Sequence, residues 1–214
     1  MNPIHFAMSC LLLFIPQGIL PAHLLPYNAP VEQSYRVILS DESKLSIVGR
    51  TNISQFTCKY TQTIEPDVLD VYVRQEKDGL VFSNAFILLQ TMYFKAGPSQ
   101  MNQDLQTFLK VKEYPTATIR LLKLRLTKAQ LADSQLQKAM SEMEITLAGV
   151  TKTYEIPVSI SRNGEERLLS GGLELNICDF NLEPPVVMMG MIRVKEAVKV
   201  NFMLRACIEK NIIN

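Results

Sequence analysis

Apolar and polar residues alternate with a period of two along most of the chain after residue 35. The alternation is clearest in segments 142–147, 154–160 and 173–177, and the longest run covers 198–208. Because successive side chains of a strand point to opposite faces, each segment predicts a β-strand with one apolar and one polar face. Strands of this kind are typical of an antiparallel sheet that packs on one side.

Local signals mark where these strands turn and bend. An Ala-Gly pair at 148–149 divides two strands, and the Asn-Gly pair at 163–164 is a strong signal for a two-residue hairpin. In a further strand, apolar residues alternate over 117–121 and then continue out of phase over 122–126. A one-residue shift turns every later side chain to the other face, so the doubled Leu121-Leu122 predicts a bulge or a bend.

Two segments favour helices instead. Residues 99–110 follow a Gly-Pro pair, have Ser99 as a candidate N-cap, and carry an apolar stripe made by Met101, Leu105, Phe108 and Leu109. A Tyr-Pro pair at 114–115 ends this segment. Residues Thr127–Met140 are rich in Ala, Gln and Lys and predict a second short helix.

Together these elements predict a mainly all-β fold with one or two short helices. We expect a closed or nearly closed antiparallel barrel of about eight strands, and the alternative is an open two-sheet sandwich. A barrel of this size has room either for packed side chains or for one small ligand. The alternation does not distinguish a filled barrel from a hollow one, because both need apolar inner faces.

The charges begin late in the chain, at Glu32. Before it, Phe6–Ile15 is an apolar run closed by Pro16, too short for a membrane helix of about 20 residues and typical of a signal peptide. No Lys or Arg precedes this run, and Ala22 is an acceptable cleavage position. We therefore divide the chain into a signal peptide or N-terminal leader (1–31) and a barrel domain (32–214). A periplasmic or secreted location follows, with a packed or disordered N-terminal arm as the alternative.

Charge and histidine content exclude several functions. The chain has 22 Lys and Arg against 21 Asp and Glu, which leaves no basic footprint for nucleic acid. Both histidines, His5 and His23, lie in the leader, so the barrel domain lacks the imidazole of common nucleophile pairs and of His-containing zinc sites. Glu142 and Glu144 lie on a polar strand face rather than in an apolar pocket. We therefore expect no metal site, no catalytic residues and no enzyme activity.

Cysteine usage adds little chemistry. The four cysteines are Cys10, Cys58, Cys178 and Cys207, and no CxxC pair occurs. Without the leader three remain, so at most one internal disulfide can form, and its pairing stays open. Cys58 lies between Phe56 and Tyr60 on one strand face, which favours a buried thiol over a redox role.

Several short sequence segments occur in an order that is typical of one protein family. They are KLSIVGRTNISQFTCKY at 44–60, MNQDLQTFLKVKEYPTATIRL at 101–121, ITLAGVTKTYEIPV at 145–158, SGGLELNICDFNL at 170–182 and GMIRVKEAVKVNFML at 190–204. From about residue 35 to the C-terminus the chain thus resembles the YceI-like family of exported bacterial lipid-binding proteins. The resemblance implies an extended lipocalin-like antiparallel β-barrel. Some members of the family hold a long polyisoprenoid chain in the barrel, and none of the shared phrases is a catalytic motif.

The barrel lumen is the first candidate site. We expect an apolar small molecule or lipid there, such as a bound isoprenoid or another long-chain lipid, and no other cofactor. Burial of its chain would supply roughly 25 cal/mol per Å² of apolar area. The predicted ligand-binding residues are Phe56, Tyr60, Phe86, Met101, Leu105, Phe108, Ile119, Ile145, Leu147, Ile156, Val158, Leu175, Phe202 and Leu204. Leu173 and Val200 are further residues expected to face inward.

Each candidate has a plainer alternative. The apolar residues could form a solid core, which would make the protein a ligand-free structural or interaction module of the cell envelope. The helix 101–109 and the Met-rich stretch 188–191 could line an entrance for a lipid tail, or they could be a plug and a strand with buried Met. Lys123, Arg125 and Lys128 could meet anionic head groups, or they could form an ordinary solvated strand face. An enzyme that uses a carboxylate or thiol in the lumen ranks last.

Overall fold

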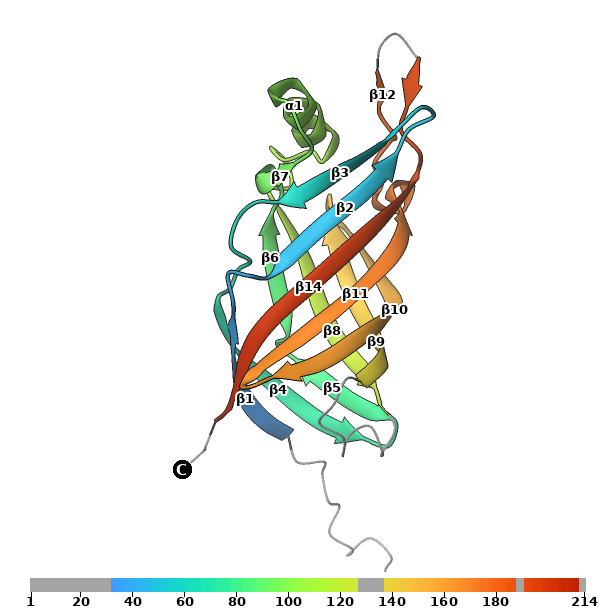
Figure 1. Cartoon of the computed structure of the whole chain (residues 1–214). Coiled ribbons are helices and arrows are strands. Elements are labelled where there is room, and N and C mark those ends of the chain that lie inside the picture. Colours follow the sequence, from blue (N-terminus) through green and yellow to red (C-terminus); the bar gives the residue numbers. More distant parts are fainter. Residues whose placement is uncertain (1–31, 127–136, 188–190, 212–214) are drawn as a thin grey trace, which may run out of the picture.

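The computed structural model describes residues 32–126, 137–187 and 191–211, and within them it is a β-barrel with one α-helix at one end (Figure 1). The leader lies outside the described residues. The helical elements are α1 (Ser99–Phe108) and the short 3-10 turns η2 (Thr91–Tyr93) and η3 (Ile177–Phe180). The strands are β1 (Glu32–Leu39), β2 (Lys44–Arg50), β3 (Gln55–Tyr60), β4 (Val68–Glu76), β5 (Gly79–Ser83), β6 (Phe86–Gln90), β7 (Phe94–Lys95), β8 (Thr116–Arg125), β9 (Gln137–Leu147), β10 (Val150–Asn163), β11 (Glu166–Asn176), β12 (Val186–Val187), β13 (Ile192–Arg193) and β14 (Ala197–Lys210).

A closed ring of antiparallel strands forms the barrel. Its order is β1-β4-β5-β8-β9-β10-β11-β14, and the ring closes because β14 also pairs with β1. The last strand pairs with β11 along one edge, and with β2 and then β1 along the other. From β2 the sheet continues into β3 and β7, while β6 pairs with β8. The eight strands of the ring close on themselves, which confirms the predicted barrel, so the open sandwich is wrong.

The predicted turns and the bulge are present. Ala148 and Gly149 both have positive φ, as a two-residue hairpin turn between β9 and β10 requires. The next hairpin joins β10 to β11, but its central residues are Gly164 and Glu165, one position later than predicted, because Asn163 pairs with Glu166. The register of β8 against β9 shifts between Leu121 and Lys123, which confirms the bulge.

Of the two predicted helices, the first is present and the described part of the second is a strand. The helix α1 begins at Ser99 as expected, but Pro98 occupies the N-cap position without a side-chain bond, and the Asn102 side chain accepts from the N–H groups of Ala96 and Gly97 instead. Of the predicted second helix, 127–136 lie outside the described residues. The prediction is wrong for Gln137–Met140, which begin β9 and pair with β10. Cross-strand pairing overrides the helix propensity of this Ala-, Gln- and Lys-rich segment.

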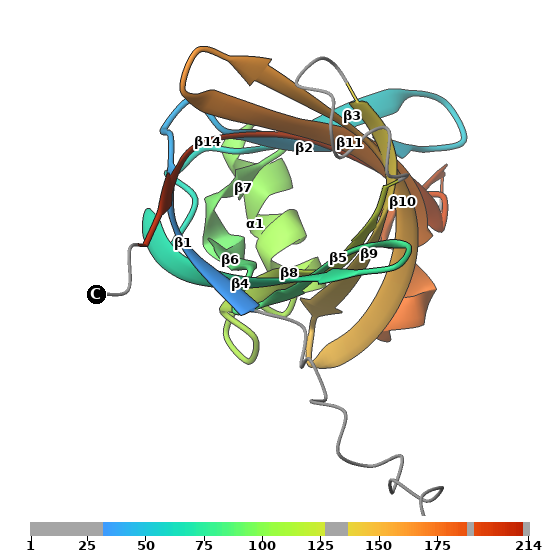
Figure 2. The ribbon, with the colours of Figure 1, turned by 90° about the horizontal axis from the view of Figure 1, so that it is seen from below.

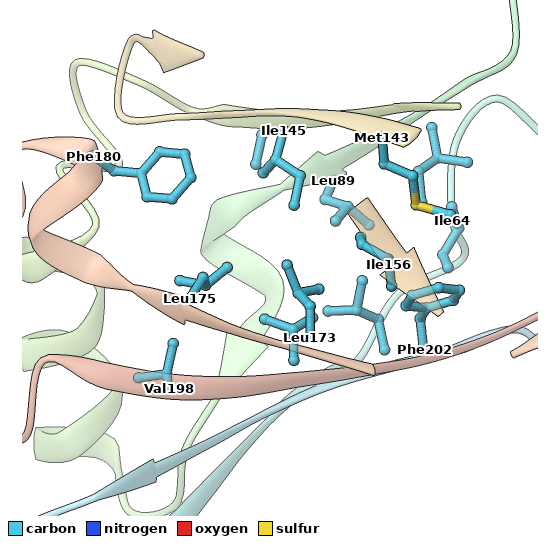
Figure 3. Close-up of a cluster of buried hydrophobic side chains, with 14 of the residues drawn as sticks. Ile64, Leu89, Met143, Ile145, Ile156, Leu173, Leu175, Phe180, Val198 and Phe202 are labelled. Atoms are coloured by element: carbon cyan, nitrogen blue, oxygen red, sulfur yellow. The ribbon is translucent and has the colours of Figure 1, made fainter. Parts of the chain in front are cut away.

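A solid part of the core lies at the end of the barrel that carries α1, the upper end in Figure 1, which we call the filled end. Figure 3 shows Phe180, from η3, pointing into the interior near Leu175 and Ile145. Phe180 and Leu182 are almost completely buried, at 0% and 1% exposure. The side chains that fill this end come from the ring and from elements outside it. They are Leu89, Phe94, Leu109, Leu175, Ile177, Phe180, Leu182 and Val198.

Candidate functional site

An apolar cavity of about 570 Å³ lies inside the barrel below the filled end. Its volume is within the range of about 300–1,000 Å³ that is typical of small-molecule sites. We call it the lumen cavity, and we call the lower end of the barrel in Figure 1 the open end. Figure 2 looks into the barrel from this open end, with the strands in a ring and α1 at the far end.

The period-two alternation of the strands builds the cavity wall. Tyr35 and Val37 of β1, Val71 of β4 and Leu204 of β14 point inward and line the cavity. The residues between them point outward, as the ion pair between Arg36 and Asp70 illustrates (3.9 Å). One face of each strand therefore forms an apolar wall, and the other meets solvent.

The cavity is blind, because it stops at a defined layer of the barrel. Ile87, Ile119 and Ile145 are directly opposite one another on β6, β8 and β9, and all three line the cavity. One layer further toward α1, the paired residues Leu89 and Ala117 are buried in the solid core instead. The lumen is thus filled from the α1 end down to this boundary and hollow beyond it.

Side chains from outside the ring account for this boundary. An eight-stranded barrel is just wide enough either for its own side chains or for one small ligand. At the filled end, Phe94, Leu109, Phe180 and Leu182 come from segments outside the ring and occupy that space. Toward the open end, the described residues from outside the ring that line the cavity are Leu45 of β2 and Ala85, Phe86 and Ile87 at β6, and they lie in the cavity wall. The lumen there is left to solvent or to a ligand.

The cavity is elongated along the barrel. On β14 its wall runs from Val200 to Ile208. A strand rises about 3.3 Å per residue, so this wall spans on the order of 26 Å along the strand. With a strand tilt of about 40°, the depth along the barrel axis is on the order of 20 Å. Such a shape suits a chain-like molecule better than a compact one.

Among the described residues, the polar groups of the cavity wall lie at the open end. Gln33, Gln75 and Arg167, together with Tyr35, lie where β1 and β11 begin and where β4 ends. Deeper in the barrel, the buried Ser141 hydroxyl is satisfied because it donates to the carbonyl of Ile156 (2.8 Å). The inner part of the cavity therefore offers apolar contact without charge.

The three cysteines that the structure describes lie outside the cavity wall. Cys58 is buried in β3, outside the cavity wall, as its strand pattern predicted. Burial raises the pKa of its thiol to about 11, so the thiol stays protonated at neutral pH. Cys178 and Cys207 are free as well, so none of these three forms a disulfide. Within 32–126, 137–187 and 191–211, no group of His, Cys, Asp and Glu side chains could hold a metal ion.

The cavity wall includes part of the predicted ligand-binding set. From that set, Phe86, Ile119, Ile145, Ile156, Phe202 and Leu204 line the cavity, as do Leu173 and Val200. Their contact with a ligand stays a prediction. The other predicted residues lie outside the cavity wall, and we do not propose them as ligand contacts. They are Phe56, Tyr60, Met101, Leu105, Phe108, Leu147, Val158 and Leu175.

Several of the predicted residues outside the cavity wall pack against other parts of the protein. Val158 and Leu175 are buried core residues, and Leu147 packs against the same core. Tyr60 is on β3, outside the ring, where its ring lies 5.2 Å from that of Phe94. Phe56 is on the same strand, directly opposite Gly49 of β2. In these cases the alternation correctly predicted an apolar face, but that face packs against protein.

The helix predicted to line an entrance lies at the filled end of the barrel, away from the lumen cavity. In α1, Leu105 and Phe108 pack against the core, and Met101 is partly buried near Gly97. The helix therefore covers the filled end, and the lumen cavity has none of its residues in the wall. Of the Met-rich stretch, 188–190 lie outside the described residues, and Met191 is 68% exposed rather than buried.

The strands that sequence reasoning missed supply much of the wall. Leu69, Val71 and Val73 of β4 and Leu80 and Phe82 of β5 line the cavity, as do the inward residues of β1. A period-two signal is present in VLDVYVRQE at 68–76 and could have identified β4. Arg167 has no local signal of its own, because its lumen position follows only from the hairpin register.

The basic strand is a solvated face of the barrel. Lys123 is bonded to Asp78 (3.0 Å) and Glu76 (3.2 Å), and Arg125 to Glu155 (2.6 Å). These partners neutralise both cations, while Lys128 lies outside the described residues. Glu142 and Glu144 are on the same outer surface, where Glu144 pairs with Arg120 (3.0 Å). The strand-face alternative for this patch is therefore the better interpretation.

A closed antiparallel barrel with a blind, elongated apolar cavity defines the class of lipocalin-like β-barrels. The YceI-like domain matches residues 40–206, and the chain therefore belongs to this family. The predicted recognition and fold class are confirmed. Among the described residues, no helix has the length and apolar character needed to cross a membrane.

Solved structures share the fold at low sequence identity. One is BcnA of Burkholderia cenocepacia, 18% identical with a TM-score of 0.59, over 77% of this chain and 96% of that one. Another is a polyisoprenoid binding domain from Saccharophagus degradans implicated in plant cell wall breakdown, 15% identical with a TM-score of 0.57, over 84% and 99% of the two chains. The chain matches none of the curated proteins with which it was compared.

Proposed function

We propose that this protein binds an apolar, chain-like lipid in the lumen cavity, and that it sequesters or carries the lipid rather than transforming it. The observation that carries the proposal is the blind apolar cavity of about 570 Å³ beneath a solid core. A barrel that served only as a structural module would have no need of a hollow half. Membership of the YceI-like family and the polyisoprenoid binding domain of similar fold also support the proposal.

The mechanism is burial of the chain against the apolar wall. Each methylene group moved from water into such a wall contributes about 0.8 kcal/mol, so a long chain needs almost no polar help. The open end, where Gln33 and Arg167 lie, would admit the chain, and the layer of Ile87, Ile119 and Ile145 would stop it. We expect the polar end of the lipid to stay at the open end.

Lipid extraction with mass spectrometry tests the proposal. Full-length protein from a membrane-containing lysate should show a lipid-bound mass by native mass spectrometry, and organic extraction should release the same lipid. Ala206→Phe places an aromatic ring on the cavity wall and should lose the lipid while keeping the fold, measured by circular dichroism. A matched control is Leu168→Phe, on the outer face of β11. Apo mass alone, with no extractable lipid, would favour the ligand-free module.

We also propose that the protein is exported. The uncharged leader with its apolar run at 6–15 supports a signal peptide. Sequencing the N-terminus of the cell-derived protein tests this point. Cleavage near Ala22 is the expected result, and an intact Met1 on cytoplasmic protein would contradict it. This test is independent of the lipid experiment.

A further inference from the structure

Two arginines lie opposite each other at the open end of the barrel. Arg162 of β10 and Arg167 of β11 are direct register partners across the hairpin. Residues directly opposite in an antiparallel pair point to the same face, with Cβ atoms about 5 Å apart. Arg167 lines the lumen cavity, and Arg162 continues the period-two series of Ile156 and Ile160, which also line it. Two like charges are therefore placed side by side on the lumen face.

Neither arginine has a carboxylate partner among the described residues. The Arg162 Nε donates to the carbonyl of Gly164 (2.9 Å), and Arg167 Nη1 makes long bonds to the carbonyls of Glu165 and Glu166 (3.4 and 3.3 Å). These acceptors belong to the same hairpin. Because a guanidinium has five N–H donors, most of the donors of both side chains have no protein acceptor within 32–126, 137–187 and 191–211.

Three arginines on the outer surface do have carboxylate partners. Arg120, Arg125 and Arg205 lie 3.0, 2.6 and 2.9 Å from their nearest carboxylate oxygens. Glu166, next to Arg167 in sequence, points to the outer face and lies 3.7 Å from Arg205. Opposed like charges without counterions are unfavourable, and among the described residues the lumen pair, unlike these three outer arginines, has no carboxylate partner.

On the lumen face at the open end, the charged side chains of the described residues are basic. Lys210 follows Ile208 on the lumen-facing series of β14 and is opposite Tyr35, which lines the cavity. Among the described residues of the cavity wall, Arg167 is charged and no Asp or Glu is present. The lumen cavity is therefore apolar at its blind end and cationic at its entrance. An amphiphile with an anionic head has the complementary distribution.

We propose that Arg162 and Arg167 bind the anionic head group of the ligand, so that the cargo is an apolar chain ending in a phosphate or carboxylate rather than a neutral lipid. The inference rests on the proposed function, because it needs a chain in the lumen cavity. The planar guanidinium matches the oxygens of both anions and forms strong bidentate bonds with them. A bound anion also removes the repulsion between the two arginines.

Paired ligands that differ only in the head group test the proposal. Delipidated protein is titrated with geranylgeranyl phosphate and with geranylgeraniol, and binding is followed by displacement of diphenylhexatriene, a neutral apolar probe. We expect the phosphate to bind about tenfold more tightly than the alcohol, the effect of one strong charge-assisted hydrogen bond. The double variant Arg162→Gln/Arg167→Gln should bind both ligands with the affinity of the alcohol. Arg36→Gln, which removes the same charge type from the outer face, should keep the preference.

A second pair of ligands distinguishes the two anions. Oleate and oleyl alcohol repeat the comparison with a carboxylate, and a preference for oleate alone would identify the head group as a carboxylate. Raising the salt concentration should weaken phosphate binding to the unmodified protein and leave alcohol binding unchanged, a readout that needs no variant. Equal affinities for both anions and their alcohols would overturn the head-group proposal and leave the proposed function in place. Binding of none of the four ligands would overturn both.

Discussion

The boundary between the solid core and the lumen cavity can be tested by truncating one leucine in the filled end and one on the cavity wall. Leu175 of β11 is 7% exposed, directly opposite Val198, and part of the filled end. Leu204 of β14 is partly buried and lines the lumen cavity. Leu175→Ala and Leu204→Ala remove the same atoms, so any difference in stability reports their surroundings.

The expected magnitudes follow from the two environments. In the filled end, Leu175→Ala loses about 2.4 kcal/mol of transfer free energy. The space left behind adds about 1 kcal/mol, since a cavity costs about 24 cal/mol per Å³, for a total of about 3.5 kcal/mol. Leu204 already faces open space, so its truncation creates no new enclosed void, and only part of its surface was removed from water. We expect Leu204→Ala to cost about 1 kcal/mol.

Urea titration followed by far-ultraviolet circular dichroism measures both free energies of unfolding. Delipidated protein is required, because a ligand that binds only the folded state would raise its stability. In thermal melts, 1 kcal/mol corresponds to a shift of about 2–4 °C for a chain of this size. Leu175→Ala should therefore lower Tm by about 7–14 °C, and Leu204→Ala by about 2–4 °C.

Binding of diphenylhexatriene should show the opposite order. Leu204→Ala changes the cavity wall and should change the affinity for the probe, whereas folded Leu175→Ala protein should bind it normally. Equal losses of stability at the two positions would refute the division of the barrel into a filled and a hollow part. In that case the lumen would be packed along its whole length, and the carrier proposal would lose its basis.

Three further predictions concern the thiol, the bulge and the outer surface. Burial raises the pKa of the Cys58 thiol from 9.0 to about 11, so between these pH values the folded state keeps a proton that the unfolded chain loses, and the free energy of unfolding should fall as pH rises from about 9 to 11. Urea titrations of Cys58→Ala should show a smaller fall. Identical pH profiles of the variant and the unmodified protein would contradict the assignment. Deleting Leu122 removes the bulge and leaves Leu121 and Leu124 two positions apart, both still on the lumen face, so the deletion variant should melt cooperatively, and loss of cooperative melting would show that the fold needs the bulge itself. Arg120→Ala removes an exposed ion pair and should lower the free energy of unfolding by less than about 1 kcal/mol in the same titration. A larger loss of stability would indicate that the outer ion pairs act as a network.

Local features of the barrel could be predicted from the sequence because their causes are local. The bulge in β8 was visible as Leu121-Leu122, since an extra residue in one strand changes the phase of its period-two pattern. The hairpin after Asn163 was visible in its turn residues, although its register was misplaced by one position. That register is what sets Arg162 opposite Arg167, so a correct turn assignment would have revealed the cationic entrance.

The boundary of the cavity could not be predicted in the same way. Leu173 and Leu175 occupy equivalent positions on one strand, yet Leu173 lines the cavity and Leu175 is in the solid core. What separates them is Phe180, which returns to the barrel from η3 and occupies the interior beside Leu175 (Figure 3). Its position depends on tertiary packing, which no period in the sequence records. The same limit applies to Gln137–Met140, where pairing with β10 overrode local propensity.

The unliganded barrel retains two unfavourable features, and one ligand would relieve both. The apolar wall of the hollow half contacts solvent through the open end, and Arg162 opposes Arg167 with no carboxylate partner for either in the described part of the chain. An apolar chain covers the first, and an anionic head group neutralises the second. Ligand at 100 times its Kd should then add about 2.7 kcal/mol of stability, which corresponds to a rise in Tm of about 5–11 °C. At equal ligand concentrations, the phosphate should raise Tm more than the alcohol does. In the Arg162→Gln/Arg167→Gln protein the two rises should be equal, because the chain still binds there and the charge no longer contributes.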